Sequence, residues 1–173
     1  MGLSTDYPIV PDAIACRPPE PRPESLALNG PDANEMLDLV NQWRSANGVA
    51  SLSINWELMA AAQAHSEDMA NNNFLDHTGS DGSTPASRAQ RSGYPSSFVG
   101  ENVAAGYATF EGVLTAYMEE TPPDDGHRRN VLSEAYHEIG FGYAYNDSSD
   151  FKQYWTQDFG SVENLTTNRI TRG

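Results

Sequence analysis

The sequence predicts an α+β fold, in which helices come first and strands come last. Between residues 32 and 120, apolar residues recur at intervals of three and four, which is the spacing of amphipathic helices. Residues 137–160 instead alternate large apolar residues with small or polar ones, which is the period of strands. Helices followed by strands favour a layer of helices packed against a sheet, and 173 residues suit one domain.

The first helix is predicted to begin after Asp32. Asp32 and Glu35 form a D-x-x-E capping signal, and Asn47-Gly48 is a typical helix end. Apolar residues between these signals form a stripe that we expect to face the core: Met36, Leu37, Val40 and Trp43.

A second helix is predicted to follow Asn55. Its apolar stripe contains Leu58, Ala62, His65 and Met69. His65 therefore lies on the face that we expect to be buried, where a histidine normally has a hydrogen-bond partner. We interpret it as a hydrogen-bonded core residue.

Two shorter helices are predicted further along. Thr84, followed by a proline, caps a helix that ends at Gly93. Thr109 caps another that runs to about Glu120 and is stopped by the prolines at 122–123. The intervening segment, residues 96–108, is rich in glycine and alanine, and both a short strand and an irregular segment fit it.

The last predicted element is an antiparallel hairpin. Residues 137–146 and 151–160 both have strand periodicity, and the polar sequence NDSSD between them is typical of a turn. Trp155 and Phe159 should share one face of the second strand, with Tyr154 on the other.

Charge and cysteine content exclude several functions. The 24 acidic residues outnumber the 10 basic ones, for a net charge of −14, which repels phosphate backbones and anionic lipid surfaces. We therefore expect no nucleic-acid partner. No apolar run approaches the roughly 20 residues of a transmembrane helix, and one cysteine permits no intramolecular disulfide.

The ends of the chain differ from the middle. Residues 1–30 are proline-rich and have little apolar pattern, so we expect a flexible leader or spacer, then a domain over 31–162 and a tail over 163–173. Small residues before Cys16 are similar to a bacterial lipoprotein cleavage site, although no basic segment and apolar stretch precede it. A lipid anchor and a plain thiol are both open.

Four ionisable residues occupy unusual positions. His77 lies in a polar loop, and Glu101 lies among small and apolar residues that suggest burial. Glu120 extends the apolar face of its helix, and His127 follows it after two prolines and a glycine. A buried carboxylate is costly, so Glu101 should have a partner.

Two histidines and two glutamates have three physical uses. They can bind a divalent metal with the carboxylates as orienting partners, perform general acid–base chemistry, or form a buried network that braces the structure. Sequence spacing does not choose among these uses, and separate structural roles also remain open.

Five motifs in order resemble the CAP superfamily, which unites cysteine-rich secretory proteins, antigen 5 and pathogenesis-related protein 1. They are AQAHSEDMANNNFLDHTGSDGSTPASRAQRSGY, GENVAAG, DGHRRNVL, HEIGFGYAY and YWTQDFG. The resemblance covers residues 33–161 and is greatest to the disulfide-free bacterial branch. It implies a three-layer α-β-α sandwich with a central antiparallel sheet and an open cleft that holds two histidines and two acidic residues.

By position, the family's cleft residues correspond to His77, Glu101, Glu120 and His127. Tyr117 stands where the family often has tryptophan, and the sequence TPPDDGH is longer than the SPGH usual in bacteria. The difference affects the cleft wall next to Glu120.

The resemblance implies a secreted or surface-tethered binding protein. Its cleft would hold a divalent cation, most simply zinc, on His77 and His127, with Glu101 and Glu120 as orienting or water-mediated partners. The alternatives are a metal-dependent hydrolase that uses the same four residues, with Glu101 as base, and a lipid-, sterol- or protein-binding module. Catalytic zinc usually has three protein ligands, and only two imidazoles are present, so we lean away from an enzyme. The ligand is an unidentified small molecule, lipid or protein, and we expect a monomer.

Overall fold

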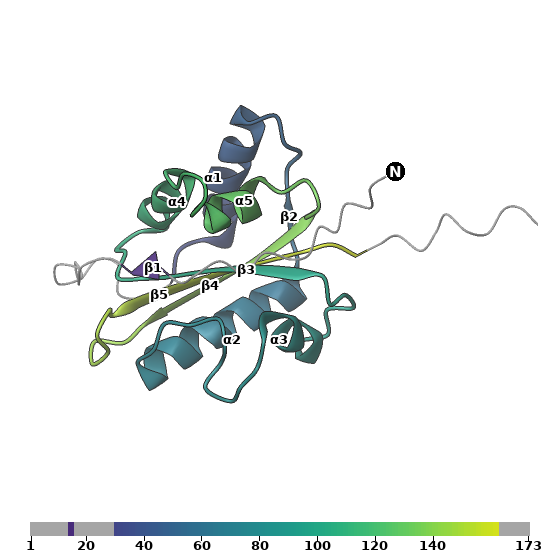
Figure 1. Ribbon diagram of the computed structural model, residues 1–173. Coiled ribbons are helices and arrows are strands. Elements are labelled where there is room, and N and C mark those ends of the chain that lie inside the picture. Colours follow the sequence, from purple (N-terminus) through teal and green to yellow (C-terminus); the bar gives the residue numbers. More distant parts are fainter. Residues whose placement is uncertain (1–13, 16–29, 163–173) are drawn as a thin grey trace, which may run out of the picture.

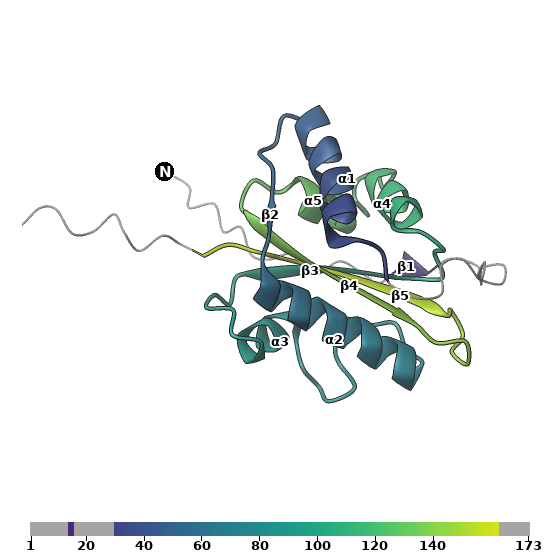
Figure 2. The same ribbon diagram turned by 180° about the vertical axis from the view of Figure 1, so that it is seen from behind.

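A computed structural model describes residues 14–15 and 30–162 of the chain. The fold has three layers, with helices on both faces of one sheet (Figure 1). Helices α1, α4 and α5 cover one face, and α2 and α3 cover the other, which the reverse view confirms (Figure 2). The elements in chain order are β1 (Ile14–Ala15), α1 (Ala33–Ala46), β2 (Ser53–Ile54), α2 (Trp56–Asn72), α3 (Pro85–Arg91), β3 (Val99–Ala105), α4 (Phe110–Met118), α5 (Gly126–Leu132), β4 (Glu138–Tyr145) and β5 (Gln153–Gly160). The predicted sandwich is confirmed.

The sheet has five strands in the order β1-β3-β5-β4-β2. The three central strands are antiparallel, as predicted, whereas β1 and β2 run parallel to their neighbours at the two edges. The predicted hairpin is β4 and β5, paired from Glu138 opposite Gly160 to Tyr145 opposite Gln153. The segment that the sequence left undecided is strand β3, and all seven of its residues are buried.

The helix starts agree with the capping signals. Asp32 accepts hydrogen bonds from the backbone N–H groups of Asn34 and Glu35, and Asn55 accepts one from that of Leu58. Thr84 and Ser87 form a capping box at the start of α3, and Thr109 caps α4.

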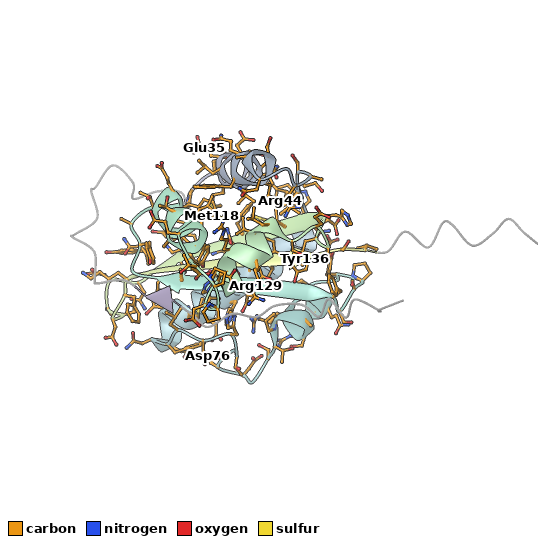
Figure 3. All side chains as sticks on the ribbon, turned by 45° about the horizontal axis from the view of Figure 1, so that its top comes forward. Glu35, Arg44, Asp76, Met118, Arg129 and Tyr136 are labelled. Atoms are coloured by element: carbon orange, nitrogen blue, oxygen red, sulfur yellow. The ribbon has the colours of Figure 1, made fainter. Side chains whose placement is uncertain are left out.

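The predicted core stripe of α1 is wrong at one position. Trp43 is 39% exposed, whereas its neighbour Arg44 is 1% exposed. The Arg44 guanidinium donates to the backbone carbonyls of Ala50 (2.7 Å), Val131 (2.7 Å) and Ser133 (2.9 Å). Figure 3 shows Arg44 on the side of the sheet that α1 and α4 cover, with Asp76 on the opposite side. These carbonyls stabilise a buried charge that the apolar pattern of the helix does not predict.

Helix α2 packs directly onto β4. A Cβ atom at Gly140 would overlap the backbone of Leu58, and one at Gly142 would overlap the backbone of Ala62. Because these positions have no side chain, the helix lies close to the strand. This contact fixes α2, and with it His65, against the sheet.

The region between α4 and β4 differs from the prediction. Helix α4 ends at Met118 rather than near Glu120, so Glu120 lies beyond the helix instead of extending its apolar face. The chain then forms a further helix, α5, which was not predicted from the sequence.

Part of the predicted leader is structured. Ile14 and Ala15 pair with Ala104 and Ala105 of β3. The rest of the leader up to residue 29, including Cys16, and the predicted tail over 163–173 lie outside the described residues. Within residues 14–15 and 30–162, no helix has the length and apolar character to cross a membrane.

Candidate functional site

Glu101 is fully buried in strand β3, and both of its carboxylate oxygens have partners. His77 Nδ1 lies 2.7 Å from Oε1, and the Arg88 guanidinium donates to Oε2 at 2.6 Å. The expectation that a buried Glu101 needs a partner agrees with this arrangement.

Arg88 connects the carboxylate to the loop that carries His77. It comes from α3, is 6% exposed, and also donates to the backbone carbonyls of His77 and Ser83, both at 3.0 Å. One guanidinium therefore positions Glu101 and the backbone of His77 together. This role of Arg88 was not predicted from the sequence.

His65 also lies near Glu101 and is a core residue, as predicted. It is fully buried, its Nε2 lies 2.9 Å from the Asp76 carbonyl oxygen, and the same atom is 3.8 Å from Glu101 Oε1. Burial lowers the pKa of His65, with Arg88 acting in the same direction and Glu101 opposing it. This favours a neutral imidazole.

A second acid, which the sequence analysis missed, accompanies Glu101. Asp158 of β5 is the cross-strand neighbour of Glu101 and is fully buried. Neither of its oxygens has a donor among the described residues. Burial raises the pKa of Asp158 well above its ordinary value, and the negative charge of Glu101 acts in the same direction. Asp158 is therefore a neutral acid next to Glu101.

Glu101 itself is ionised. Burial alone would raise its pKa, but the hydrogen bond from His77 and the positive charge of Arg88 oppose burial, and its pKa is lowered. The site thus contains one charged and one neutral carboxyl group, side by side.

His127 and Glu120 form a second histidine–carboxylate pair. His127 Nδ1 lies 2.5 Å from Glu120 Oε1, while Glu120 Oε2 accepts hydrogen bonds from the backbone N–H groups of His127 (3.0 Å) and Arg128 (3.2 Å). Glu120 therefore caps the first turn of α5. The His127 ring stacks on Tyr117, with centroids 4.5 Å apart and planes 9° apart.

Two buried amides connect the pairs. The Asn130 side chain donates to the Glu101 carbonyl (3.2 Å) and to the Asn102 side chain (2.9 Å), and Asn102 donates to the His127 carbonyl (3.2 Å). Burial raises the pKa of the Tyr117 phenol, and the negative charges of Glu120 and Glu101 contribute. The carboxylates of both pairs thus contribute to raising the pKa of the same phenol, that of Tyr117.

Two histidine–carboxylate pairs make up the candidate site. His77 precedes α3 and pairs with Glu101 of β3, whereas His127 of α5 pairs with Glu120 from the segment between α4 and α5. Across residues 30–162 with β1, no three or more His, Cys, Asp or Glu side chains are arranged to hold a metal ion. Each pair resembles the hydrogen-bonded histidine of a metal site, but the described residues supply no third ligand.

Comparison with known proteins identifies the family. Residues 37–159 match the family described as "CAP: Cysteine-rich secretory protein family", and the chain belongs to it. It is 33% identical over 125 residues to "Uncharacterized protein YkwD" of Bacillus subtilis strain 168, which covers 72% of this chain and 45% of the relative. It is 27% identical to "Uncharacterized membrane protein YlbC" of the same strain, covering 72% of this chain and 33% of that one. The chain thus spans less than half the length of these two curated relatives.

Solved structures agree with this fold. A Bacillus anthracis extracellular protein containing a SCP domain superposes with a TM-score of 0.64 at 25% identity, covering 78% of this chain and 45% of that one. An outer surface protein from Borrelia burgdorferi gives a TM-score of 0.65 at 19% identity, covering 78% of this chain and 98% of that one. The family resemblance expected from the five motifs is confirmed.

Proposed function

We propose that this chain is an exported CAP-domain binding module that holds a divalent cation, most simply zinc, on His77 and His127. Glu101 and Glu120 orient the two imidazoles. The observation that carries the proposal is that Nδ1 of each histidine lies against a carboxylate, at 2.7 Å and 2.5 Å.

This contact selects the tautomer. A carboxylate at Nδ1 favours the proton on that atom, which leaves the Nε2 lone pair as the metal-binding nitrogen. Histidine ligands of zinc normally have such a partner, because it fixes the ring and raises its basicity. The buried ion pair between Glu101 and Arg88 holds the first carboxylate in place, and the α5 backbone holds the second.

Two imidazoles do not complete the coordination of zinc. Zinc in proteins usually has four ligands, so two positions would belong to water or to a bound partner. This favours recognition over structural metal binding, since the cation would offer open positions to a ligand.

The proposed location is outside the cell or on its surface. The solved relatives include an extracellular and an outer surface protein, and the acidic composition is compatible with solubility there. An anchor at Cys16 belongs to this proposal, and fatty-acid labelling of the exported protein tests it.

Calorimetric titration with zinc tests the metal site. We expect one site in the full chain, and its affinity should be lost in the His77→Ala/His127→Ala variant. His137, an exposed histidine whose Nδ1 lies 2.5 Å from Ser161 Oγ, supplies the control, and His137→Ala should bind as the parent does. Affinity should also fall below about pH 6, where protons compete for imidazole. Unchanged affinity in the double variant would end the metal proposal.

We do not extend the proposal to hydrolysis. The hydrolase alternative makes Glu101 a general base, yet Arg88 and His77 stabilise its charged form and its pKa is lowered. A general base is more effective with a pKa near the working pH. Peptide and ester libraries with zinc should give no turnover, and turnover that Glu101→Gln abolishes would restore the alternative.

A further inference from the structure

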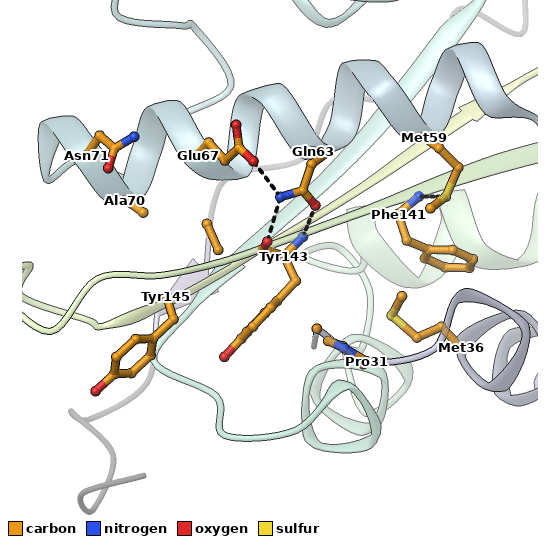
Figure 4. A pocket seen from close by; sticks show the side chains of 12 residues that line it. Pro31, Met36, Met59, Gln63, Glu67, Ala70, Asn71, Phe141, Tyr143 and Tyr145 are labelled. Atoms are coloured by element: carbon orange, nitrogen blue, oxygen red, sulfur yellow. Dashed lines mark hydrogen bonds between the residues drawn. The ribbon is translucent and has the colours of Figure 1, made fainter. Parts of the chain in front are cut away.

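A cavity of about 400 Å³ lies along the outer edge of β4, between that strand and α2, and the proposed metal residues do not line it (Figure 4). Its volume is within the range of small-molecule sites. Figure 4 shows that the side chains lining the cavity are apolar at one end and polar at the other. Met36, Met59 and Phe141 line one end, and Glu67, Asn71 and Tyr145 line the other.

The edge of β4 is not available to another strand at the centre of this cavity. Strand β2 pairs only with Glu138 and Ile139 among the described residues of β4. Further along, the Gln63 side chain donates to the Tyr143 carbonyl (2.9 Å) and accepts from the Tyr143 N–H (3.1 Å). The Gln63 amide thus occupies both backbone groups that an added peptide strand would need. A ligand therefore cannot bind at this position by adding a strand to β4. It must fill the cavity with groups other than a peptide backbone.

The polar end is acidic. The Glu67 carboxylate is fixed by a 2.9 Å hydrogen bond from Gln63 Nε2, and within the described part of the chain it is the only charged side chain that lines the cavity. Next to that end, the Tyr145 hydroxyl donates to Asp147 (3.1 Å), which is paired with the Lys152 ammonium (3.1 Å). Of the residues that the structure describes, no Lys, Arg or His lines the cavity.

We propose that this cavity binds a small amphiphilic cation, with an ammonium head at Glu67 and Tyr145 and a linear apolar tail directed toward Met59 and Phe141. The carboxylate and the tyrosine ring both attract a cation. The thioethers and the phenylalanine at the other end accommodate a flexible chain. Phe141 and Tyr145 are four strand residues apart, or about 13 Å, which suits a medium-length alkyl chain. The net charge of −14 and Glu67 disfavour a fatty-acid anion.

Three ligands with the same tail test the proposal: octyltrimethylammonium, octanol and octanoate. Each is titrated by calorimetry below the concentration at which it forms micelles or separates from water. The cation should bind, and the alcohol and the anion should bind more weakly. Butyltrimethylammonium should also bind more weakly than the octyl compound, because it buries fewer methylenes. In amide NMR spectra, the shifts should cluster on α2 and β4.

Glu67→Gln should weaken cation binding about fivefold, the upper range for an exposed ion pair. Glu67 is on the surface of α2, so the variant should keep its circular dichroism spectrum. The control is Glu57→Gln, the same change at an exposed position of the same helix outside the cavity, and it should bind as the parent does.

Equal affinity for cation and anion, or unchanged cation affinity in Glu67→Gln, would overturn the proposal. The His77→Ala/His127→Ala variant should retain cation binding. The two proposals therefore fail or hold separately.

Discussion

Asp158 lies directly opposite Glu101 on the neighbouring antiparallel strand, and both carboxyl groups are fully buried. Two adjacent buried carboxylates repel each other strongly, so one of them keeps its proton. Arg88 and His77 contact Glu101, which makes Glu101 the ionised member and Asp158 the neutral one. The charge state of the first histidine–carboxylate pair thus depends on a residue outside it.

Asp158→Asn should change how stability depends on pH. The pKa of Asp158 is raised from 3.8 on folding, so its contribution to the free energy of unfolding is complete below that value and is lost as pH rises toward the folded pKa. Asparagine does not titrate. Above pH 5, the parent should therefore lose stability relative to Asp158→Asn, by at most about 1.4 kcal/mol per pH unit. Urea unfolding at pH 5, 6, 7 and 8 measures this difference, and parallel curves would contradict it.

Arg88→Met should be strongly destabilising. It would leave the Glu101 carboxylate buried without its cationic partner, which typically costs about 3–5 kcal/mol. Arg91→Met is the control on the same helix, because Arg91 pairs with Asp81 where both side chains are more than half exposed. That pair should contribute little to stability, because both charged groups remain hydrated. Urea unfolding of both variants gives the comparison, and similar losses would show that Glu101 does not depend on Arg88.

Glu120→Ala should weaken zinc binding about ten- to hundredfold, as the loss of an orienting partner of a histidine ligand usually does. It should also cost about 1 kcal/mol of stability, since Glu120 caps the backbone N–H groups of His127 and Arg128. Glu119→Ala removes the same charge from the adjacent exposed residue and should change neither. The two effects are separated by calorimetry and by thermal unfolding. Equal zinc affinities for the two variants would leave Glu120 with a capping role alone.

Local signals predicted most of the fold. Asp32, Asn55 and Thr109 begin helices because their side chains accept hydrogen bonds from the next turn, an interaction within a few residues. The β4–β5 hairpin follows from strand periodicity around a turn. Strand β3 was ambiguous because glycine and alanine give no clear period.

Non-local contacts limited the prediction of the core and the site. Arg44 is buried because carbonyls nearly ninety residues away accept its hydrogen bonds, so Trp43 was assigned to the core in its place. Arg88 was missed for the same reason, since its role depends on Glu101 in another element. The face of β5 on which Asp158 lies could have been predicted from the sequence. Tyr154 was assigned to one face of that strand, and strand alternation places Asp158 on the same face. The His77–Glu101 and His127–Glu120 pairings needed the three-dimensional arrangement.

The pairing of Gln63 with Tyr143 also bears on self-association. An uncovered strand edge is a template on which copies of a chain can stack, and native proteins block such edges in several ways. Here a helix supplies a side-chain amide in place of a neighbouring peptide group. Within residues 30–162, a side chain rather than a further strand thus satisfies the edge of β4 at Tyr143, which protects this position against pairing with another copy.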